Sequence, residues 1–260
     1  MPVTTAQEAI VQGEAEYAAL LAMLRTLTSA DWSRGTDCPA WTVRDIVAHV
    51  TGAAEEAVRR RVQLRHLLVA QTRDRQRPTA DSLSAQQVAD REGHAPDQLV
   101  SELQKLAQAA PRGRAGTPGF LRRRPMPADA GCLPGDTIGY LVDTIYNRDL
   151  WMHRIDIARA TGCHLVPSDA EPAIVGQVAR DLSRAWAGTP FNLTLTGRVR
   201  GSWRIGEGHG GGGDADTAEV TVNAVALCRL LSGRSDETEP ALHGSEPDLV
   251  EALRNSRVLF

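Results

Sequence analysis

The pattern of apolar positions separates a helical part of the chain from a mixed part. In the first two-thirds, apolar residues recur at spacings of three and four, which is typical of helices with one buried face. Four such helices are predicted, over about 5–28, 43–70, 96–110 and 136–162. Gly162 suits the end of the last one, because glycine readily adopts a left-handed cap conformation. The segment 111–135 is rich in Pro, Gly and Arg without periodicity, which predicts an irregular stretch that is functional or mobile.

The second predicted helix has the clearest start signal. Thr42 followed by Asp45 resembles a capping box with Asp in place of Glu, which places the first helical residue near Val43. Its apolar face then continues through Ile46 and Val50.

The last third of the chain changes to alternating polar and apolar residues. After a short helix over 169–187, the segments 191–197, 199–206 and 218–223 alternate with a period of two, as half-buried strands do. A glycine-rich run at 206–213 is predicted to be a hairpin loop, since it lacks the Lys and Ser/Thr of a phosphate-binding loop. Two further helices are predicted over 223–232 and 247–255.

These elements predict the α+β fold class with two domains. The first is an antiparallel four-helix bundle over residues 1–165. The second is a small α+β domain over residues 166–260, with a mostly antiparallel sheet.

Composition excludes several classes of protein. The 260 residues are 42% hydrophobic, enough for a core, and the net charge of −3 argues against a nucleic-acid partner. No run of 18 apolar residues is present, and acidic residues interrupt the N-terminal apolar pattern, so neither a membrane span nor a signal peptide is expected. Four scattered cysteines without a CxxC pair favour reduced thiols. We therefore expect a cytoplasmic monomer or homodimer.

Candidate chemistry lies on two of the predicted helices. Asp149 and His153 are four residues apart, which places their Cβ atoms about 5–6 Å apart on one helix face. Both could reach one metal ion at about 2.0–2.2 Å, and His49, at the edge of the inner face of the second helix, is the best third ligand. Two histidines and one carboxylate leave a position open, as in catalytic zinc sites, and also suit ferrous iron.

The spacing alone leaves ordinary structural roles open for these residues. His49 could be a hydrogen-bonded residue at the edge of the core. Asp149 could pair with Arg148 or Arg154 on the helix surface. Asp156, one turn beyond Met152 on the same face, could pair with Arg159 or accept a hydrogen bond from His153.

Two segments resemble a known family. CPAWTVRDIVAHV at 38–50 and RDLWMHRIDI at 148–157 are similar to the mycothiol-dependent maleylpyruvate isomerase family, which belongs to the DinB-like metal-binding helical bundles. The resemblance implies that His49, Asp149 and His153 bind the metal. The isomerase has Glu at the position of Asp149, so the carboxylate here is one methylene shorter. A looser similarity in the last third includes Gly233-Arg234 after a helix.

The resemblance also implies a function. Mycothiol, the low-molecular-weight thiol of actinobacteria, would be the co-substrate, and a divalent metal, zinc before others, would activate its thiolate. The implied activity is an isomerase or S-transferase acting on a small electrophile. No cysteine of the chain is expected to be the nucleophile. Asp156 is expected to accept from the free ring nitrogen of a ligand histidine, and Arg234 to bind a substrate carboxylate.

Two other functions stay open at this point. One is a thiol-independent hydrolase or cyclase of secondary metabolism that uses the same metal with bound water. The other is a metal-stabilised bundle that binds a partner or sequesters a small molecule without catalysis.

Overall fold

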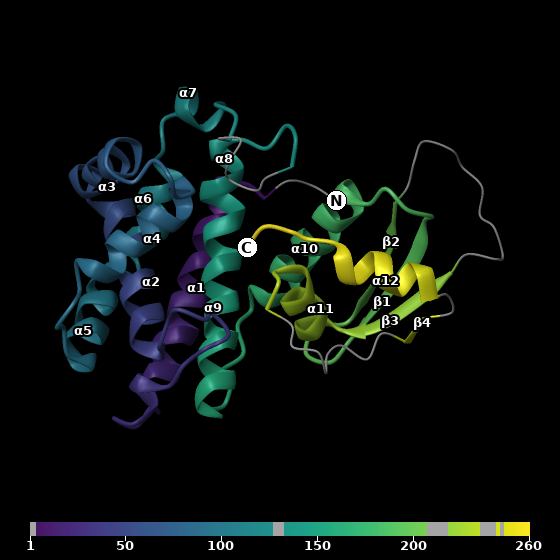
Figure 1. The fold of residues 1–260 in the computed structure, drawn as a ribbon, viewed down its shortest axis with the longest axis horizontal. Helices are drawn as coiled ribbons and strands as arrows, with labels where there is room; N and C mark the ends of the chain where they lie inside the picture. The colour runs from purple at the N-terminus through teal and green to yellow at the C-terminus, as the bar shows by residue number, and fades with distance from the viewer. Residues whose placement is uncertain (1–3, 127–132, 207–217, 235–242, 245–246) are drawn as a thin grey trace. The chain divides into compact units, whose positions relative to one another are not determined.

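The computed structural model describes residues 4–126, 133–206, 218–234, 243–244 and 247–260. The chain divides into two compact units, Thr4–Ala170 and Glu171–Phe260 (Figure 1). The first unit is mainly helical, and the second combines helices with one small sheet. Among the described residues, no helix is both long and apolar enough to cross a bilayer.

The helical unit contains all four predicted helices together with shorter ones. Its elements are α1 (Ala6–Leu24), η1 (Asp31–Ser33), α2 (Val43–Val58), α3 (Arg60–Thr72), α4 (Thr79–Ala89), α5 (Pro96–Leu106), α6 (Ala109–Ala115), α7 (Gly119–Arg122), α8 (Ile138–Tyr140), the π-helical turn η3 (Leu141–Ile145) and α9 (Tyr146–Thr161). The predicted second helix is broken at Arg59, whose ψ of 86° is not helical. A simple four-helix bundle is not confirmed, because α4 and α6 also pack against α2.

Three short helices, α4, α6 and α7, were not predicted. Helix α4 has few large apolar residues and buries Ser82 and Gln87 instead, so it shows no clear apolar periodicity. Helix α6 lies in the segment 111–135 that was expected to be irregular, and this expectation was wrong for 111–115 and for α7. Pro111, the third residue of α6, is tolerated there because a backbone N–H in the first turn has no acceptor within the helix, so the N–H that proline lacks is not missed. Residues 127–132 of that segment lie outside the described residues.

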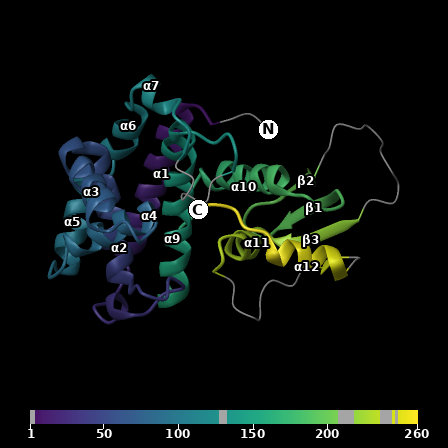
Figure 2. The same cartoon turned by 45° about the horizontal axis from the view of Figure 1, so that its top comes forward.

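The core of the helical unit lies between α1, α2, α5 and α9. Helices α1, α2 and α9 run alongside one another in both views (Figures 1 and 2). Fully buried side chains from these helices fill the space between them, among them Tyr17, Leu20, Met23, Val43, Ile46, Val47, Leu99, Leu103, Leu150 and Ile157. This packing brings one face of α2 against α9.

Local signals set the ends of the two helices that carry the candidate ligands. The capping box at the start of α2 is confirmed: the Asp45 N–H bonds to the Thr42 hydroxyl, and the Asp45 carboxylate accepts from the Thr42 N–H at 3.0 Å. Gly162 has φ 72° and ends α9 in the left-handed conformation, as predicted.

The second unit contains a mixed sheet. Its elements are α10 (Glu171–Ala185), β1 (Phe191–Thr196), β2 (Gly201–Ile205), β3 (Glu219–Asn223), α11 (Ala224–Leu231), β4 (His243–Gly244) and α12 (Pro247–Asn255). The strand order is β2-β1-β3-β4. Leu193 lies opposite Trp203 in the antiparallel β1–β2 pair and opposite Val220 in the parallel β1–β3 pair. The expected mostly antiparallel sheet is therefore not confirmed, because alternation along a strand does not report the direction of its neighbour.

The sheet order also corrects the interpretation of the glycine-rich run at 206–213. Strand β1 lies between β2 and β3, so the chain between β2 and β3 does not connect paired strands. The predicted hairpin is wrong for this reason. Residues 207–213 themselves lie outside the described part of the chain.

Candidate metal centre

Three predicted ligands from two helices lie together in the helical unit. His49 comes from the second turn of α2, and Asp149 and His153 come from successive turns of α9. The Nε2 atom of His49 is 3.4 Å from Oδ2 of Asp149, and Nε2 of His153 is 3.2 Å from Oδ1 of the same carboxylate. One potential ligand atom from each residue lies within 4.8 Å of the other two.

These separations fit a shared cation. Ligands at about 2.1 Å from a tetrahedral zinc ion are about 3.4 Å from one another. The two nitrogen–oxygen distances, 3.4 Å from His49 to Oδ2 and 3.2 Å from His153 to Oδ1 of Asp149, are close to that value, and they end on different oxygens of one carboxylate. Two imidazole nitrogens and one carboxylate are also the donor set of an open, catalytic zinc or ferrous site. The residues present therefore fit a divalent metal.

The cluster is buried on its histidine side and accessible on its carboxylate side. His49 and His153 are 7% and 2% exposed, whereas the Asp149 side chain is 24% exposed. The Trp41 ring lies over both imidazoles, with centroids 4.9 Å from that of His49 and 5.9 Å from that of His153.

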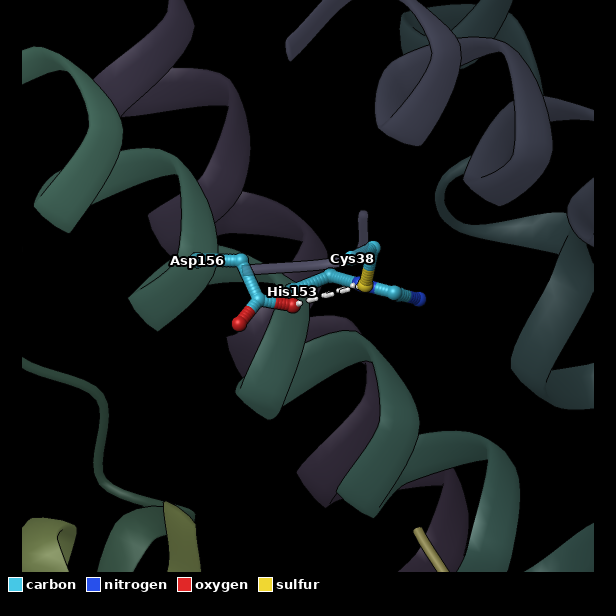
Figure 3. Close-up of side chains that lie close together, drawn as sticks. All are labelled: Cys38, His153 and Asp156. Atoms are coloured by element: carbon cyan, nitrogen blue, oxygen red, sulfur yellow. Dashed lines mark hydrogen bonds and ion pairs between the residues drawn. The ribbon is translucent and has the colours of Figure 1, made fainter. Parts of the chain in front are cut away.

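The second ring nitrogen of His153 is held by another carboxylate. Asp156, fully buried one turn further along α9, lies with Oδ2 3.0 Å from Nδ1 of His153 (Figure 3). A carboxylate at Nδ1 fixes the ring orientation and leaves Nε2 directed at the metal position. This contact is the one expected for Asp156 from the sequence.

Cys38 is the neighbour that sequence reasoning missed. Its Sγ lies 3.6 Å from Oδ2 of Asp156, and Cys38, His153 and Asp156 form a second group with close ligand atoms (Figure 3). From the sequence we expected no cysteine to be the nucleophile and assigned Cys38 no role beside His153. The thiol faces the Nδ1 side of His153, whereas Asp149 and His49 lie at the Nε2 side. The signal that could have located it was its place in the same CPAW segment as Trp41.

Long-range contacts hold the loop of Cys38 and Trp41 against α9. Arg159 donates from Nε to Asp37 at 3.1 Å, and Arg34 donates to the carbonyl of Ala160 at 3.3 Å. Helical spacing could predict neither pair, because more than one hundred residues separate the two partners in each.

The electrostatics of the cluster favour an ionised carboxylate. Burial by itself raises the pKa of Asp149, but the His153 charge and hydrogen bonds from both histidines outweigh it and hold this pKa well below its usual range. Burial likewise lowers the pKa of His153, yet the Asp149 charge and hydrogen bonds involving Asp149, Asp156 and Cys38 raise it well above the ordinary value. Asp149 therefore contacts two histidines as an anion.

Arg148 and Arg154, the two arginines that the sequence offered as partners of Asp149, have other contacts. Arg154 pairs with Glu16 in the core, and Arg148 donates to the Tyr140 hydroxyl at 3.1 Å. Arg234 follows α11 in the second unit, where its carbonyl accepts from Arg229. The cluster residues all belong to the first unit, so the role expected for Arg234 stays a prediction.

Comparison with known proteins identifies the family. A family model described as the mycothiol maleylpyruvate isomerase N-terminal domain matches residues 14–158, which include all three cluster residues. The chain belongs to this family. The resemblance inferred from the two sequence segments is therefore confirmed, and with it the assignment of the chain as an enzyme related to mycothiol-dependent isomerases.

Solved structures of the isomerase share the fold. The mycothiol-dependent maleylpyruvate isomerase is 14% identical, with a TM-score of 0.56 over 94% of this chain and 96% of that one. A histidine-to-alanine mutant of a protein of the same name gives 13% identity, with the same TM-score and coverage. Comparison with curated proteins gives no significant match. At these identities the structures support the fold of this member of the isomerase family and not its substrate.

Proposed function

We propose that this protein is a metal-dependent, mycothiol-dependent isomerase or S-transferase acting on a small electrophilic acid. His49, Asp149 and His153 would hold one divalent cation, zinc in the first place. The observation that carries the proposal is the convergence of these three donors, at separations that suit tetrahedral coordination, in a chain of the isomerase family.

A bound cation would favour the thiolate form of a thiol at its open position, since coordination lowers a thiol pKa from its usual value near 8.5. A lowering of about two units corresponds to about 2.7 kcal/mol. The residues of the chain have supporting roles. Asp156 orients His153, Trp41 shields the imidazoles from water, and the partly exposed Asp149 leaves a path for the thiol and the substrate.

The proposed substrate is an unsaturated acid of the maleylpyruvate type, the compound in the names of the solved relatives. The mycothiol sulfur would add to one carbon of the conjugated double bond, which becomes a single bond and can rotate. Departure of the same sulfur restores the double bond in the trans form and regenerates the thiol. A substrate with a leaving group would instead end as the S-conjugate. A reduced thiol co-substrate is consistent with a cytoplasmic protein.

The test combines metal analysis with thiol titration. Elemental analysis of the purified protein should find close to one zinc per chain. After cobalt substitution, mycothiol should produce thiolate–metal absorption, and maleylpyruvate should be isomerised only when the thiol is present. Turnover that is unchanged without thiol would favour a hydrolase or cyclase on the same site, and a chain that binds no metal would overturn the proposal.

A further inference from the structure

Arg114 is a buried arginine with unused hydrogen-bond donors. It lies on α6, is 5% exposed, and donates from one terminal nitrogen to the Tyr17 hydroxyl at 3.1 Å and to the Ala53 carbonyl at 3.4 Å. Its Nε and its other terminal nitrogen are buried without a hydrogen-bond partner among the described residues. A buried donor without an acceptor is costly, and more so when it carries charge. Two donors of the Arg114 guanidinium group are therefore left without an acceptor by the described residues.

Helix packing holds this arginine close to the candidate metal centre. Ala53 is one turn beyond His49 on α2, so the carbonyl that accepts from Arg114 lies about 6 Å further along this helix than His49. A close helix crossing sets this position: a Cβ on Gly113 would lie 2.3 Å from the carbonyl oxygen of Ala57, so only glycine lets α6 approach α2 this far.

Tyr146 lies beneath the guanidinium and extends the same surface toward Asp149. The carbon at the centre of the Arg114 guanidinium is 4.3 Å from the centroid of the Tyr146 ring, a cation–π contact. Tyr146 is the first residue of α9, three positions before Asp149. Burial and the nearby charges of Glu56 and Asp149 raise the pKa of Tyr146 to about 12, so its hydroxyl keeps a proton to donate.

Glu56, a buried carboxylate that also acts on Tyr146, does not satisfy Arg114. Glu56 lies close enough to influence Tyr146, but one of its oxygens is bound by His66 and Gln87, and the other is buried without a hydrogen bond. No ion pair between Glu56 and Arg114 occurs within the described residues. An acceptor from outside the chain could therefore bind Arg114, while Glu56 would limit its affinity by repulsion.

We propose that Arg114 and the Tyr146 hydroxyl form a carboxylate-binding subsite that holds one end of the substrate while its reactive carbon lies at the metal centre. This inference rests on the proposed function and specifies it further. The ligand class is an unsaturated acid whose carboxylate lies a few bonds from the double bond. Arg114 would thus be a substrate-binding residue supplied by α6, on a different helix from the metal ligands.

The test measures binding of maleate, a cis-unsaturated dicarboxylate, to metal-free protein by calorimetry, so that chelation of the metal does not contribute. Arg114→Met should weaken binding at least tenfold, and Arg114→Lys should give an intermediate loss. Glu56→Gln should bind maleate at least threefold more tightly, because it removes a like charge. Arg91→Met is the matched control, since Arg91 is equally buried but already bound to Glu55 and Glu102, and it should leave the affinity unchanged.

The outcomes separate this subsite from the metal chemistry. Failure of maleate to bind the metal-free wild type, or unchanged affinity in Arg114→Met, would overturn the subsite. If Arg114→Met does not fold by far-UV circular dichroism, unchanged affinity in both Arg114→Lys and Glu56→Gln would overturn it instead. Zinc content and cobalt–thiol absorption of the same proteins test the proposed function separately, because Arg114 contacts none of the three metal ligands in the described interactions.

Discussion

His153 stands between two carboxylates that use its two ring nitrogens differently. Asp149 lies 3.2 Å from Nε2 and Asp156 lies 3.0 Å from Nδ1. Without a metal, a proton on each ring nitrogen satisfies both contacts. These contacts raise the pKa of His153 by more than burial lowers it. With a metal, Nε2 must lose its proton, while Asp156 still accepts from Nδ1. The same geometry thus suits both states.

Removing the imidazole should remove the metal. His153→Ala is expected to lose at least 90% of the zinc found by elemental analysis, because the site loses one of three ligands together with the Asp156 contact that orients it. Far-UV circular dichroism should change little, since alanine is a good helix former. A variant that keeps its full zinc content would exclude His153 as a ligand.

Zinc binding should tolerate a longer side chain at position 149 better than the loss of the carboxylate. Asp149→Glu keeps an oxygen donor and introduces the residue found in the isomerase, so most of the zinc should remain. Asp149→Ala removes the donor and should lose zinc to the same extent as His153→Ala. The two variants are compared by zinc content at equal protein concentration, and equal losses in both would argue against direct ligation.

At the scale of elements, small residues at helix crossings decide which helices can meet. A Cβ on Gly52 of α2 would lie 2.5 Å from Cβ of Gln87 on α4, which is closer than real Cβ atoms approach. Helix α4 therefore packs on α2 only because position 52 has no side chain. Such a contact is invisible to apolar periodicity, which is why α4 was not predicted.

Adding a methyl group at this crossing should destabilise the fold. Gly52→Ala forces the two backbones apart, and overpacking of this kind costs about 1–3 kcal/mol. Urea unfolding measures the change in free energy. Gly35→Ala is the control, since a Cβ there meets nothing within 4 Å, and it should stay close to the wild type. Equal stability of both variants would contradict the close crossing.

A buried histidine links three helices near the same crossing. His66 of α3 lies with Nδ1 2.5 Å from Glu56 of α2 and with Nε2 2.9 Å from Asp90, the residue that caps the C-terminal end of α4. Arg65 also binds Asp90, and Gln87 donates to Glu56 at 2.8 Å. The hydrogen bond to Glu56 raises the pKa of His66 despite burial, with Asp90 contributing in the same direction.

The free energy of unfolding should therefore decrease as the pH rises and His66 loses its proton. Because the folded-state pKa exceeds the unfolded value of about 6.5, protonated His66 stabilises the fold fully below that pH, and its contribution disappears as the pH rises through the raised pKa. Urea unfolding at pH 6, 7, 8 and 9 should show this decline. His66→Gln should make the decline shallower without removing it, because the pKa of His153 is raised as well, whereas exposed His164→Gln should keep it. An unchanged decline in His66→Gln would assign the effect to another group.

At the scale of the whole molecule, the residues with proposed roles are divided between the two compact units. All three candidate ligands belong to Thr4–Ala170, whereas Arg234 belongs to Glu171–Phe260. Arg114, which carries the proposed carboxylate-binding subsite, also belongs to the first unit.

Neutralising Arg234 tests this division of roles. Arg234→Met should keep the zinc content of the wild type, because no metal ligand is altered, and should raise the KM for maleylpyruvate about tenfold through loss of a charged contact. Arg254→Met, at an exposed position of α12, is the control and should keep the wild-type KM. A wild-type KM in Arg234→Met would leave Arg234 with a structural role only.

What the sequence determined by itself is what short-range geometry controls. The capping box at Thr42, the glycine end of α9 and the one-turn spacing of Asp149 and His153 follow from the fixed rise and hydrogen bonding of a helix, so all were predictable. The two family segments were also recognisable, because they are contiguous in the chain. Only the tertiary structure decided which distant residues these segments contact. Whether His49 meets Asp149 one hundred residues away, where Cys38 lies, and which strand pairs with β1 depend on the packing of distant segments, and no local period encodes that packing.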